Sequence, residues 1–388
     1  MMQVPLHIPY FDEQEEIAVK KAIRRKMIGM GPMVSTFERE FRKYVGAAEA
    51  IAVNSATAAL HLSVDVLGIG AGDEVITTAM TFCSTILAIK YTGAKPVFAD
   101  INSHDMCIDP VSVEKKVSPK TKAILIVHYA GYPCDLEAII KICQKYNLAL
   151  IEDAAHALPT VLNGKYTGAD ETRIRNLICF SFQATKTLSI GDGGMVTTSD
   201  HELAERIREK RIFGMHKIDD RQALDMTLQN EVQSLGYKYN MTDIEAAIGI
   251  VQLKKLNLMH SLREALVCRY KEILSDVPGL MFLESLVGGN SSWYIMAVRI
   301  INDEKFSKRD RLISYLANQG IKTTVHFRPV YQFPYFKKII ADTVELEVTD
   351  KLAGEVLTLP LYPAMTVYEV EYVANHIRKF FSSKAFAS

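Results

Sequence analysis

Short apolar runs alternate with stretches of helical periodicity along the first half of the chain, and this alternation limits the possible folds more than any other feature. The apolar runs predict strands at residues 51–53, 74–78, 96–100, 123–128, 148–153, 177–181 and 194–198. Helices are predicted at residues 56–67, 84–91, 109–115 and 135–146. This order is typical of a doubly wound α/β fold, in which a mostly parallel sheet carries helices on both faces. Ligands of such sheets bind at the carboxyl ends of the strands.

The pattern changes near residue 240. Residues 242–258 predict a long amphipathic helix, with Thr242 as its N-cap and Glu245 as the capping-box partner. A further helical arm follows, then strands near residues 293–300 and 323–327 and helices near residues 307–318 and 366–381. We therefore predict a large domain at residues 1–255 and a smaller C-terminal α+β domain at residues 256–388.

The composition excludes several classes of function. Lys and Arg total 45, as do Asp and Glu, and a net charge of zero argues against nucleic-acid binding. No uncharged apolar run approaches the roughly 18 residues of a membrane span, and the N-terminus does not have the pattern of a signal peptide. The 6 cysteines contain no CxxC pair, and no histidine spacing indicates a metal site. We expect a cytoplasmic protein without a metal ion.

A glycine-rich string at residues 68–73 is similar to part of a dinucleotide-binding fingerprint. That fingerprint must follow a strand and open a helix, whereas these glycines follow a predicted helix and precede a predicted strand. We therefore interpret them as a helix C-cap and a turn. An oxidoreductase on a Rossmann sheet is correspondingly disfavoured.

Two side chains at neighbouring strand ends give a stronger signal. Lys186 lies on a short loop between two apolar strands, where an amine away from bulk water can act as a nucleophile. Asp153 ends another strand, and by itself it could be simply a helix N-cap. Together they are the pair that pyridoxal phosphate chemistry needs: a lysine that binds the aldehyde and a carboxylate that faces the pyridinium nitrogen.

A phosphate site is predicted at residues 54–58, between a strand and the helix that follows it. The first turn of a helix offers free N–H groups and the positive end of the helix dipole, which bind anions. Simple N-capping by Ser55 or Thr57 is the alternative explanation of the same residues.

With these features in view, the chain resembles the sugar aminotransferases of the DegT type, within the fold-type-I pyridoxal phosphate enzymes. The resemblance runs nearly from end to end and is carried by residues 30–32, 54–61, 70–76, 93–97, 127–131, 151–157, 181–194, 236–241, 325–327 and 359–363. One departure is Asp192, where the family usually has glutamate. The shorter side chain puts the detail of this loop in doubt, but not the cofactor.

The resemblance implies a role for each of several residues. Lys186 would bind pyridoxal phosphate covalently, and Asp153 would pair with its ring nitrogen. The other implied cofactor contacts are Phe82 stacked on the ring, His156 beside it, Ser181 with the backbone of Ala56 and Thr57 at the phosphate, and Asn240 at the phosphate bound by the neighbouring subunit of a homodimer. The sugar nucleotide would contact Met30, His326 and Arg328.

Each of these residues also has a structural explanation. Phe82 could belong to the core, His156 could be a satisfied buried histidine, His326 could face inward from a strand, and Asn240 could cap a helix.

Among the subgroups, His156 and the blocks at residues 236–241 and 325–328 look most like the UDP-4-amino-4-deoxy-L-arabinose–oxoglutarate aminotransferases. This implies transfer of an amino group from L-glutamate to a UDP-4-keto sugar, for the synthesis of a surface glycan such as lipopolysaccharide. A dTDP- or GDP-linked 3- or 4-keto-deoxysugar is an alternative acceptor. A non-catalytic regulator that binds the cofactor or a sugar nucleotide is the alternative of another class.

Overall fold

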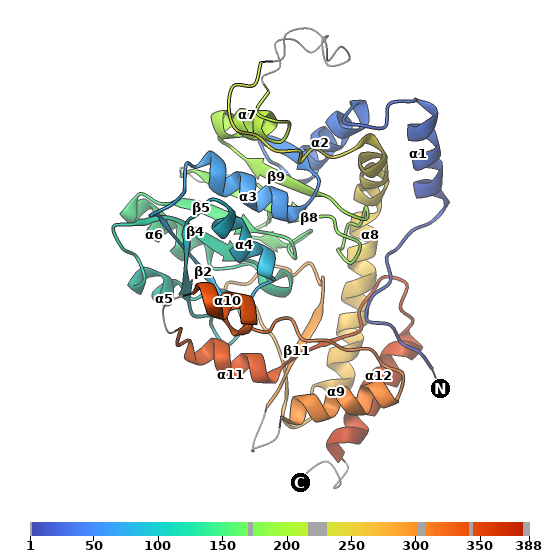
Figure 1. Ribbon diagram of the computed structural model, residues 1–388. Helices are drawn as coiled ribbons and strands as arrows, with labels where there is room; N and C mark the ends of the chain where they lie inside the picture. The colour runs from blue at the N-terminus through green and yellow to red at the C-terminus, as the bar shows by residue number, and fades with distance from the viewer. Residues whose placement is uncertain (1, 170–173, 216–230, 302–306, 341–343, 383–388) are drawn as a thin grey trace.

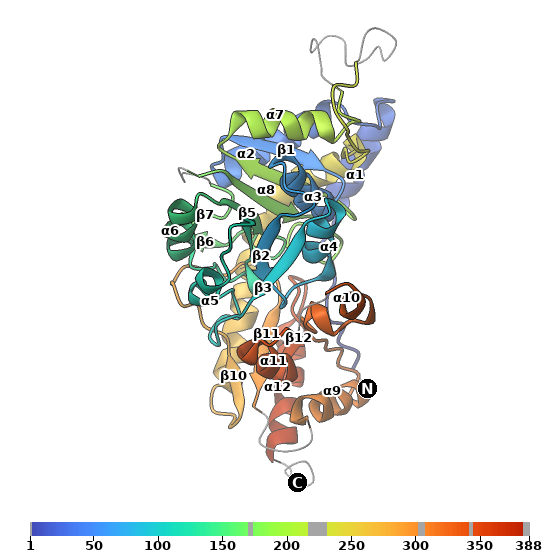
Figure 2. The same cartoon turned by 60° about the vertical axis from the view of Figure 1, so that its left-hand side comes forward.

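The computed structural model describes residues 2–169, 174–215, 231–301, 307–340 and 344–382. A mixed sheet forms its centre (Figures 1 and 2). In spatial order its strands are β1 (Glu49–Val53), β9 (Gly194–Thr198), β8 (Asn176–Ser181), β5 (Ala149–Asp153), β4 (Thr121–Val127), β2 (Glu74–Thr78) and β3 (Lys95–Ala99). β9 is antiparallel to both of its neighbours, and the other pairings are parallel. The predicted, mostly parallel sheet is confirmed.

Helices cover both faces of this sheet. One face packs against α3 (Ala56–Val66), α4 (Cys83–Tyr91) and α7 (His201–Lys210). The other packs against α2 (Pro32–Val45), α5 (Pro110–Lys115), α6 (Leu136–Tyr146) and α8 (Asp243–Leu274). In β4, Leu125 faces the first layer while Ile124 and Ile126 face the second. A strand buried on both sides is therefore apolar throughout, which explains the continuous runs in the sequence.

The glycine-rich string forms the turn between α3 and β2, as predicted. α3 ends at Val66, and Gly68 and Gly72 have φ angles of 73° and 95°, in the left-handed region that glycine adopts without strain. The Gly70 N–H donates to Asp73 Oδ2 at 3.0 Å, and β2 begins at the next residue. This segment is too far from a helix N-terminus to serve as a phosphate loop.

The helix predicted at residues 242–258 is longer than the pattern indicated. Thr242 and Glu245 form the predicted capping box, and α8 then continues for 32 residues to Leu274. No proline interrupts the sequence before Pro278, so the helical arm expected after it is part of the same helix. α8 runs from the large sheet down to the C-terminal elements (Figure 1). The proposed domain boundary at residue 255 lies within it.

A second core lies around the C-terminal half of α8. It contains the antiparallel sheet β10 (Leu280–Phe282), β11 (Met296–Ile300) and β12 (Val356–Leu359), with α9 (Lys308–Asn318) and α12 (Val367–Ser382). The remaining elements are α1 (Glu13–Arg24), β6 (Val161–Leu162), β7 (Lys165–Tyr166), α10 (Pro334–Ile339) and α11 (Glu347–Glu355). Within the described residues, no helix is both long enough and apolar enough to cross a bilayer.

The strand predicted near residues 323–327 does not form. Thr324 makes one bridge, to Thr358, and the chain then leaves the small sheet. The backbone of the next residues bonds instead to side chains that follow strands of the large sheet. The Tyr129 hydroxyl donates to the His326 carbonyl oxygen, and the Phe327 N–H donates to Met80 Sδ at 3.4 Å. Because these partners satisfy the backbone, a strand ladder is not needed here. The strand predicted at residues 293–300 is shorter than expected and begins at Met296.

The start of α2 is held by Asp243, the first residue of α8. Its Oδ1 accepts the N–H groups of Gly31, Met33 and Val34 at 2.9, 3.1 and 3.1 Å, and the side chain is buried. The α2 N-cap is a glycine, which offers no side-chain acceptor of its own. One carboxylate therefore joins the N-termini of two helices that are distant in sequence.

We expect Asp243→Ala to lower the free energy of unfolding by about 2–4 kcal/mol, because three backbone donors, one buried and two partly buried, lose a charged acceptor. Urea unfolding would measure the loss. Asp243→Asn is the matched control, since it keeps an oxygen that can accept the same N–H groups, and it should lose about 1 kcal/mol. A change below about 0.5 kcal/mol for the alanine variant would contradict this role.

Candidate active site

The carboxyl edge of the large sheet brings the two predicted catalytic residues together. Asp153 is the last residue of β5, and Ser181 is the last residue of the neighbouring parallel strand β8. Lys186 follows in the loop between β8 and β9, with its N–H donating to the Gln183 carbonyl oxygen at 2.8 Å. The amine is close enough to Asp153 for its charge to affect the pKa of that carboxyl.

Asp153 is not a helix cap, because turns rather than a helix follow β5. Its Oδ2 accepts the Thr85 hydroxyl at 2.8 Å, and its Oδ1 accepts the Ala155 N–H at 3.2 Å. Burial raises the pKa of this carboxyl, and the hydrogen bonds from Thr85 and Ala155 and the charge of Lys186 oppose the shift only in part. A cationic ligand group at this point would favour the carboxylate form.

Aromatic rings form a continuous wall beside Lys186. Its Nζ lies 4.1 Å from the centroid of the Tyr294 ring, and the His156 ring centroid lies 4.4 Å from that of Tyr294. Phe327 stacks on His156 at 5.7 Å, and Phe82 lies 6.4 Å from Phe327. Phe82 is 61% exposed, so it is not a core residue. An exposed ring at the start of α4 can cover one face of a flat ligand.

Of the two predicted histidines, His156 is buried and His326 is half-buried, and both have lowered pKa values. Burial, followed by the charge of Lys186, lowers the pKa of His326 to about 4. His326 Nδ1 lies 2.9 Å from the Thr358 hydroxyl, so this nitrogen has a partner. The pKa of His156 is also well below its ordinary value, for the same reasons. His156 Nδ1 has no hydrogen-bond partner among the described residues, so it can contact a ligand.

The predicted phosphate site has the geometry of a helix N-terminus. Ser55 is the N-cap of α3, with its hydroxyl accepting the Ala58 N–H at 3.1 Å. The N–H groups of Ala56 and Thr57 belong to the first turn and have no acceptor within the helix. Gly194 packs against this point, and a Cβ there would lie 2.6 Å from the Ser55 carbonyl group. A larger residue would displace the first turn of α3.

The other predicted residues contact other parts of the chain. Asn240 forms a bridge with Val53, and its amide donates to the Met241 carbonyl oxygen at 3.3 Å. Met30 packs against the core beneath α2. Arg328 is exposed, with its guanidinium donating to the Gln332 carbonyl oxygen at 2.9 Å. No contact recorded for the described residues joins any of these three to Lys186.

Four residues around the site were missed by the sequence analysis. Tyr294 and Phe327 belong to the ring wall, Thr85 binds Asp153, and His7 lies in the N-terminal segment near Lys186. Burial, and then the charges of Arg263 and Lys186, lower the pKa of His7 to about 4. Thr85 could have been found, because it opens a helix after a strand at the binding edge. The others carry no local signal.

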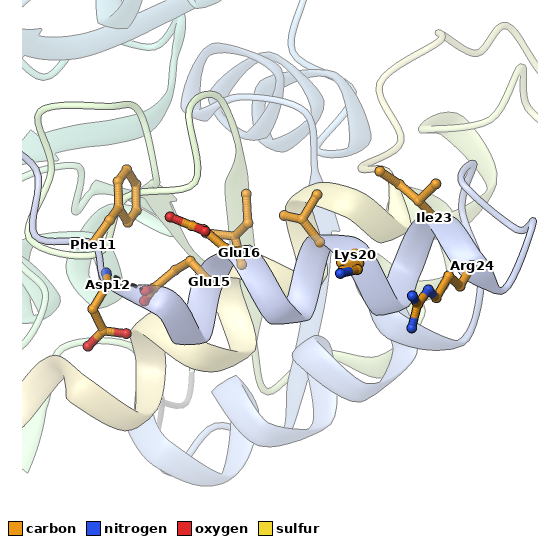
Figure 3. Close-up of a pocket in the computed structure, with 9 residues that line it drawn as sticks. Phe11, Asp12, Glu15, Glu16, Lys20, Ile23 and Arg24 are labelled. Carbon is orange, nitrogen blue, oxygen red and sulfur yellow. Dashed lines mark hydrogen bonds between the residues drawn. The ribbon is translucent and has the colours of Figure 1, made fainter.

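A separate pocket of about 770 Å³ lies between α1 and α8 (Figure 3). It is lined by Phe11, Asp12, Glu15, Glu16, Val19, Lys20, Ile23, Arg24 and Ile248. At its edge, Lys255 Nζ bonds to both Glu15 oxygens at 2.8 and 2.9 Å. None of the predicted site residues lines this pocket, so it is not the site described above.

Comparison with known proteins identifies the family and the fold. A family model described as the DegT/DnrJ/EryC1/StrS aminotransferase family matches residues 9–378. The chain belongs to this sugar aminotransferase family. Membership confirms the family resemblance of the sequence and the fold-type-I architecture.

Individual members of the family match over nearly the whole chain. The spore coat polysaccharide biosynthesis protein SpsC of Bacillus subtilis is 39% identical over 378 residues, which cover 97% of this chain and 96% of SpsC. Helicobacter pylori PseC, an aminotransferase involved in the biosynthesis of pseudoaminic acid, is 29% identical with a TM-score of 0.90, covering 98% and 99%. The PLP-form of the putative sugar aminotransferase Spr1654 from Streptococcus pneumoniae is 27% identical with a TM-score of 0.89, covering 97% and 98%.

The residues of this aminotransferase site fit pyridoxal phosphate. Lys186 supplies an amine, Asp153 a buried carboxylate, and Phe82 an exposed ring face. The α3 N-terminus supplies N–H groups for a phosphate. His156 Nδ1 adds a buried nitrogen without a protein partner among the described residues.

Proposed function

We propose that this family member transfers an amino group from L-glutamate to a nucleotide-linked 4-keto sugar, and that UDP is the nucleotide. The observation that carries the catalytic part is the convergence of Lys186, Asp153 and Phe82 at one edge of the sheet. Pyridoxal phosphate is the cofactor. When bound, it accepts the electron pair of the bond broken at the substrate carbon.

Each side chain of the site would have a separate role. Lys186 would bind the cofactor aldehyde covalently, with loss of water, and its neutral amine, when free, would be the base for the proton of the donor α-carbon. Asp153 would keep the proton on the ring nitrogen. Phe82 would cover one ring face, and His156 would lie close to the ring. The phosphate would be held by the N–H groups of Ala56 and Thr57.

Ser181 completes the phosphate site, since it ends β8 next to the Lys186 loop. We further propose a homodimer with shared active sites, in which Asn240 binds the phosphate held by the partner subunit. Asn240 lies beside Val53, the last residue of β1, and β1 leads into the phosphate site. Asn240 is therefore at the end of the sheet where the phosphate would bind, which supports this proposal.

The acceptor is proposed from the C-terminal side of the site. His326 faces the keto sugar, while Met30 and Arg328 contact the nucleotide portion. Arg328 supports this because it is exposed and its guanidinium can bind a diphosphate in a bidentate manner. The names of SpsC and PseC associate those proteins with polysaccharide and sugar-acid biosynthesis, which supports a role in glycan synthesis. A dTDP- or GDP-linked keto-deoxysugar is the alternative acceptor.

A visible-spectrum titration tests the proposed donor reaction. Purified protein loaded with cofactor should show the absorbance band of a lysine-bound pyridoxal group, and L-glutamate should bleach it. D-Glutamate at the same concentration is the control and should leave the band unchanged. A band indifferent to every amino donor would instead indicate the non-catalytic regulator, and a bound nicotinamide would indicate the oxidoreductase.

The acceptor is tested by turnover with UDP-, dTDP- and GDP-linked 4-keto sugars side by side. We expect kcat/KM for the UDP sugar to exceed the others by at least about tenfold, because a site that binds one base leaves its polar groups unpaired with another. Equal values for the three sugars would contradict the proposed nucleotide.

A further inference from the structure

Tyr294 is held in place at three points. Its N–H donates to Ser292 Oγ at 3.3 Å, and its carbonyl oxygen accepts the Arg263 guanidinium at 3.3 Å. Its hydroxyl lies 3.0 Å from Thr185 Oγ1, immediately before Lys186 in the chain. The side chain is only 7% exposed. A ring fixed at its backbone and at its hydroxyl has little freedom to move.

The face of this ring meets the Lys186 amine at 4.1 Å from the ring centroid. The interaction also affects the phenol: burial alone would raise the pKa of Tyr294, but the charge of Lys186 and the hydrogen bond shared with Thr185 lower it. A cation over an aromatic face is bound more strongly when both groups are shielded from water.

We propose that Tyr294 is a positioning residue for Lys186: its buried ring holds the free side-chain nitrogen, as the amine before it takes the donor proton and as the ammonium group afterwards, and the Thr185 hydroxyl holds the ring in that place. The inference rests on the proposed function, in which the donor displaces the Lys186 amine during each cycle. A displaced lysine has a long, flexible stem, so a ring that binds its amine keeps it next to the reacting carbon.

Several titratable groups surround this amine, and they come from separate parts of the chain. They are His7 of the N-terminal segment, Asp153 at the end of β5, His156 in the following turn, Tyr294 before β11, and His326 in the C-terminal segment. The three histidines are neutral at neutral pH, because burial and the Lys186 charge lower their pKa values. Asp153 and the Tyr294 ring therefore remain as the groups that attract the ammonium.

The test measures the free amine in cofactor-free protein. Lys186 is modified with an acylating reagent, and the rate is followed by peptide mass spectrometry across a range of pH. Tyr294→Leu removes the ring and should raise the rate at which Lys186 is acylated about tenfold at neutral pH, because the nitrogen is no longer held against the ring face. Tyr294→Phe keeps the ring and loses only the hydroxyl, so its rate should rise about twofold to threefold. Equal rates in Tyr294→Leu and the wild type would overturn the proposal.

Thr185→Val keeps the proposal testable if the leucine variant does not fold, since Thr185 is exposed. Its Lys186 acylation rate should match that of Tyr294→Phe. The double variant Thr185→Val with Tyr294→Phe should show no further increase in this rate, because both substitutions remove the hydrogen bond between the two hydroxyls. An unchanged rate in Thr185→Val would also overturn the proposal. Lys145, whose amine lies 5.0 Å from the exposed Tyr146 ring, is the internal reference, and Tyr146→Leu is the matched control. Since no cofactor is present, failure here is distinct from failure of the proposed function, which the spectral titration measures.

Discussion

Replacing Lys186 with alanine is expected to lower turnover of the glutamate half-reaction by at least about a thousandfold, which corresponds to about 4 kcal/mol of barrier. In the proposed function the side chain would supply both the covalent bond to the cofactor and the base that acts at the donor carbon, so its loss would remove two functions. Lys186 lies on a loop and is only partly buried, and its amine contacts the face of the Tyr294 ring, which belongs to the core. The fold should therefore survive the change.

Unchanged urea unfolding would confirm that Lys186→Ala affects chemistry rather than folding. Lys141→Ala is the matched control, because Lys141 is exposed on α6 and its ion pair is with Glu137 in the same helix. It should retain wild-type turnover. The alanine variant of Lys186 should also lack the visible band of the lysine-bound cofactor. Substantial turnover by that variant would disprove the assignment of Lys186.

The large sheet could be predicted from the sequence because its physics is local. A strand buried on both faces needs an apolar run, as at residues 123–127, and a helix between strands needs a cap, as Ser55 provides for α3. Parallel strands share a carboxyl edge, so Asp153 and Lys186 could be placed together before their contacts were known. These inferences need only the order of the elements along the chain.

The parts that could not be predicted depend on contacts between distant segments. Residues 323–327 have the composition of a strand, but Tyr129 and Met80 bond to their backbone, and neither partner can be identified from the local sequence. Tyr294 likewise reaches Lys186 across more than a hundred residues. His7 comes from a segment without periodicity. Local sequence patterns therefore located the candidate site residues that follow the strands of the sheet. The residues on the opposite wall of the site could be identified only from the tertiary structure.

Replacing Asp153 with asparagine tests whether the negative charge of Asp153 is needed to keep the ring nitrogen protonated. We expect kcat to fall by at least about a hundredfold, or about 2.7 kcal/mol, because a neutral amide cannot hold the proton on the ring nitrogen. The substitution suits the site: the amide oxygen can still accept the Ala155 N–H, and the amide nitrogen can donate to the Thr85 hydroxyl. Stability and cofactor binding should therefore change little.

Thr85→Val separates the charge of Asp153 from its hydrogen bonding. It removes the 2.8 Å hydrogen bond to Oδ2 but leaves the carboxylate, so kcat should fall only about fivefold, as the loss of roughly 1 kcal/mol predicts. If kcat of Asp153→Asn fell by less than about tenfold, the carboxylate would have only a structural role, as the last residue of β5 and as an acceptor for the Ala155 N–H. Because the turn after β5 contains no helix for Asp153 to cap, a large loss must come from the charge that it presents to the cofactor ring.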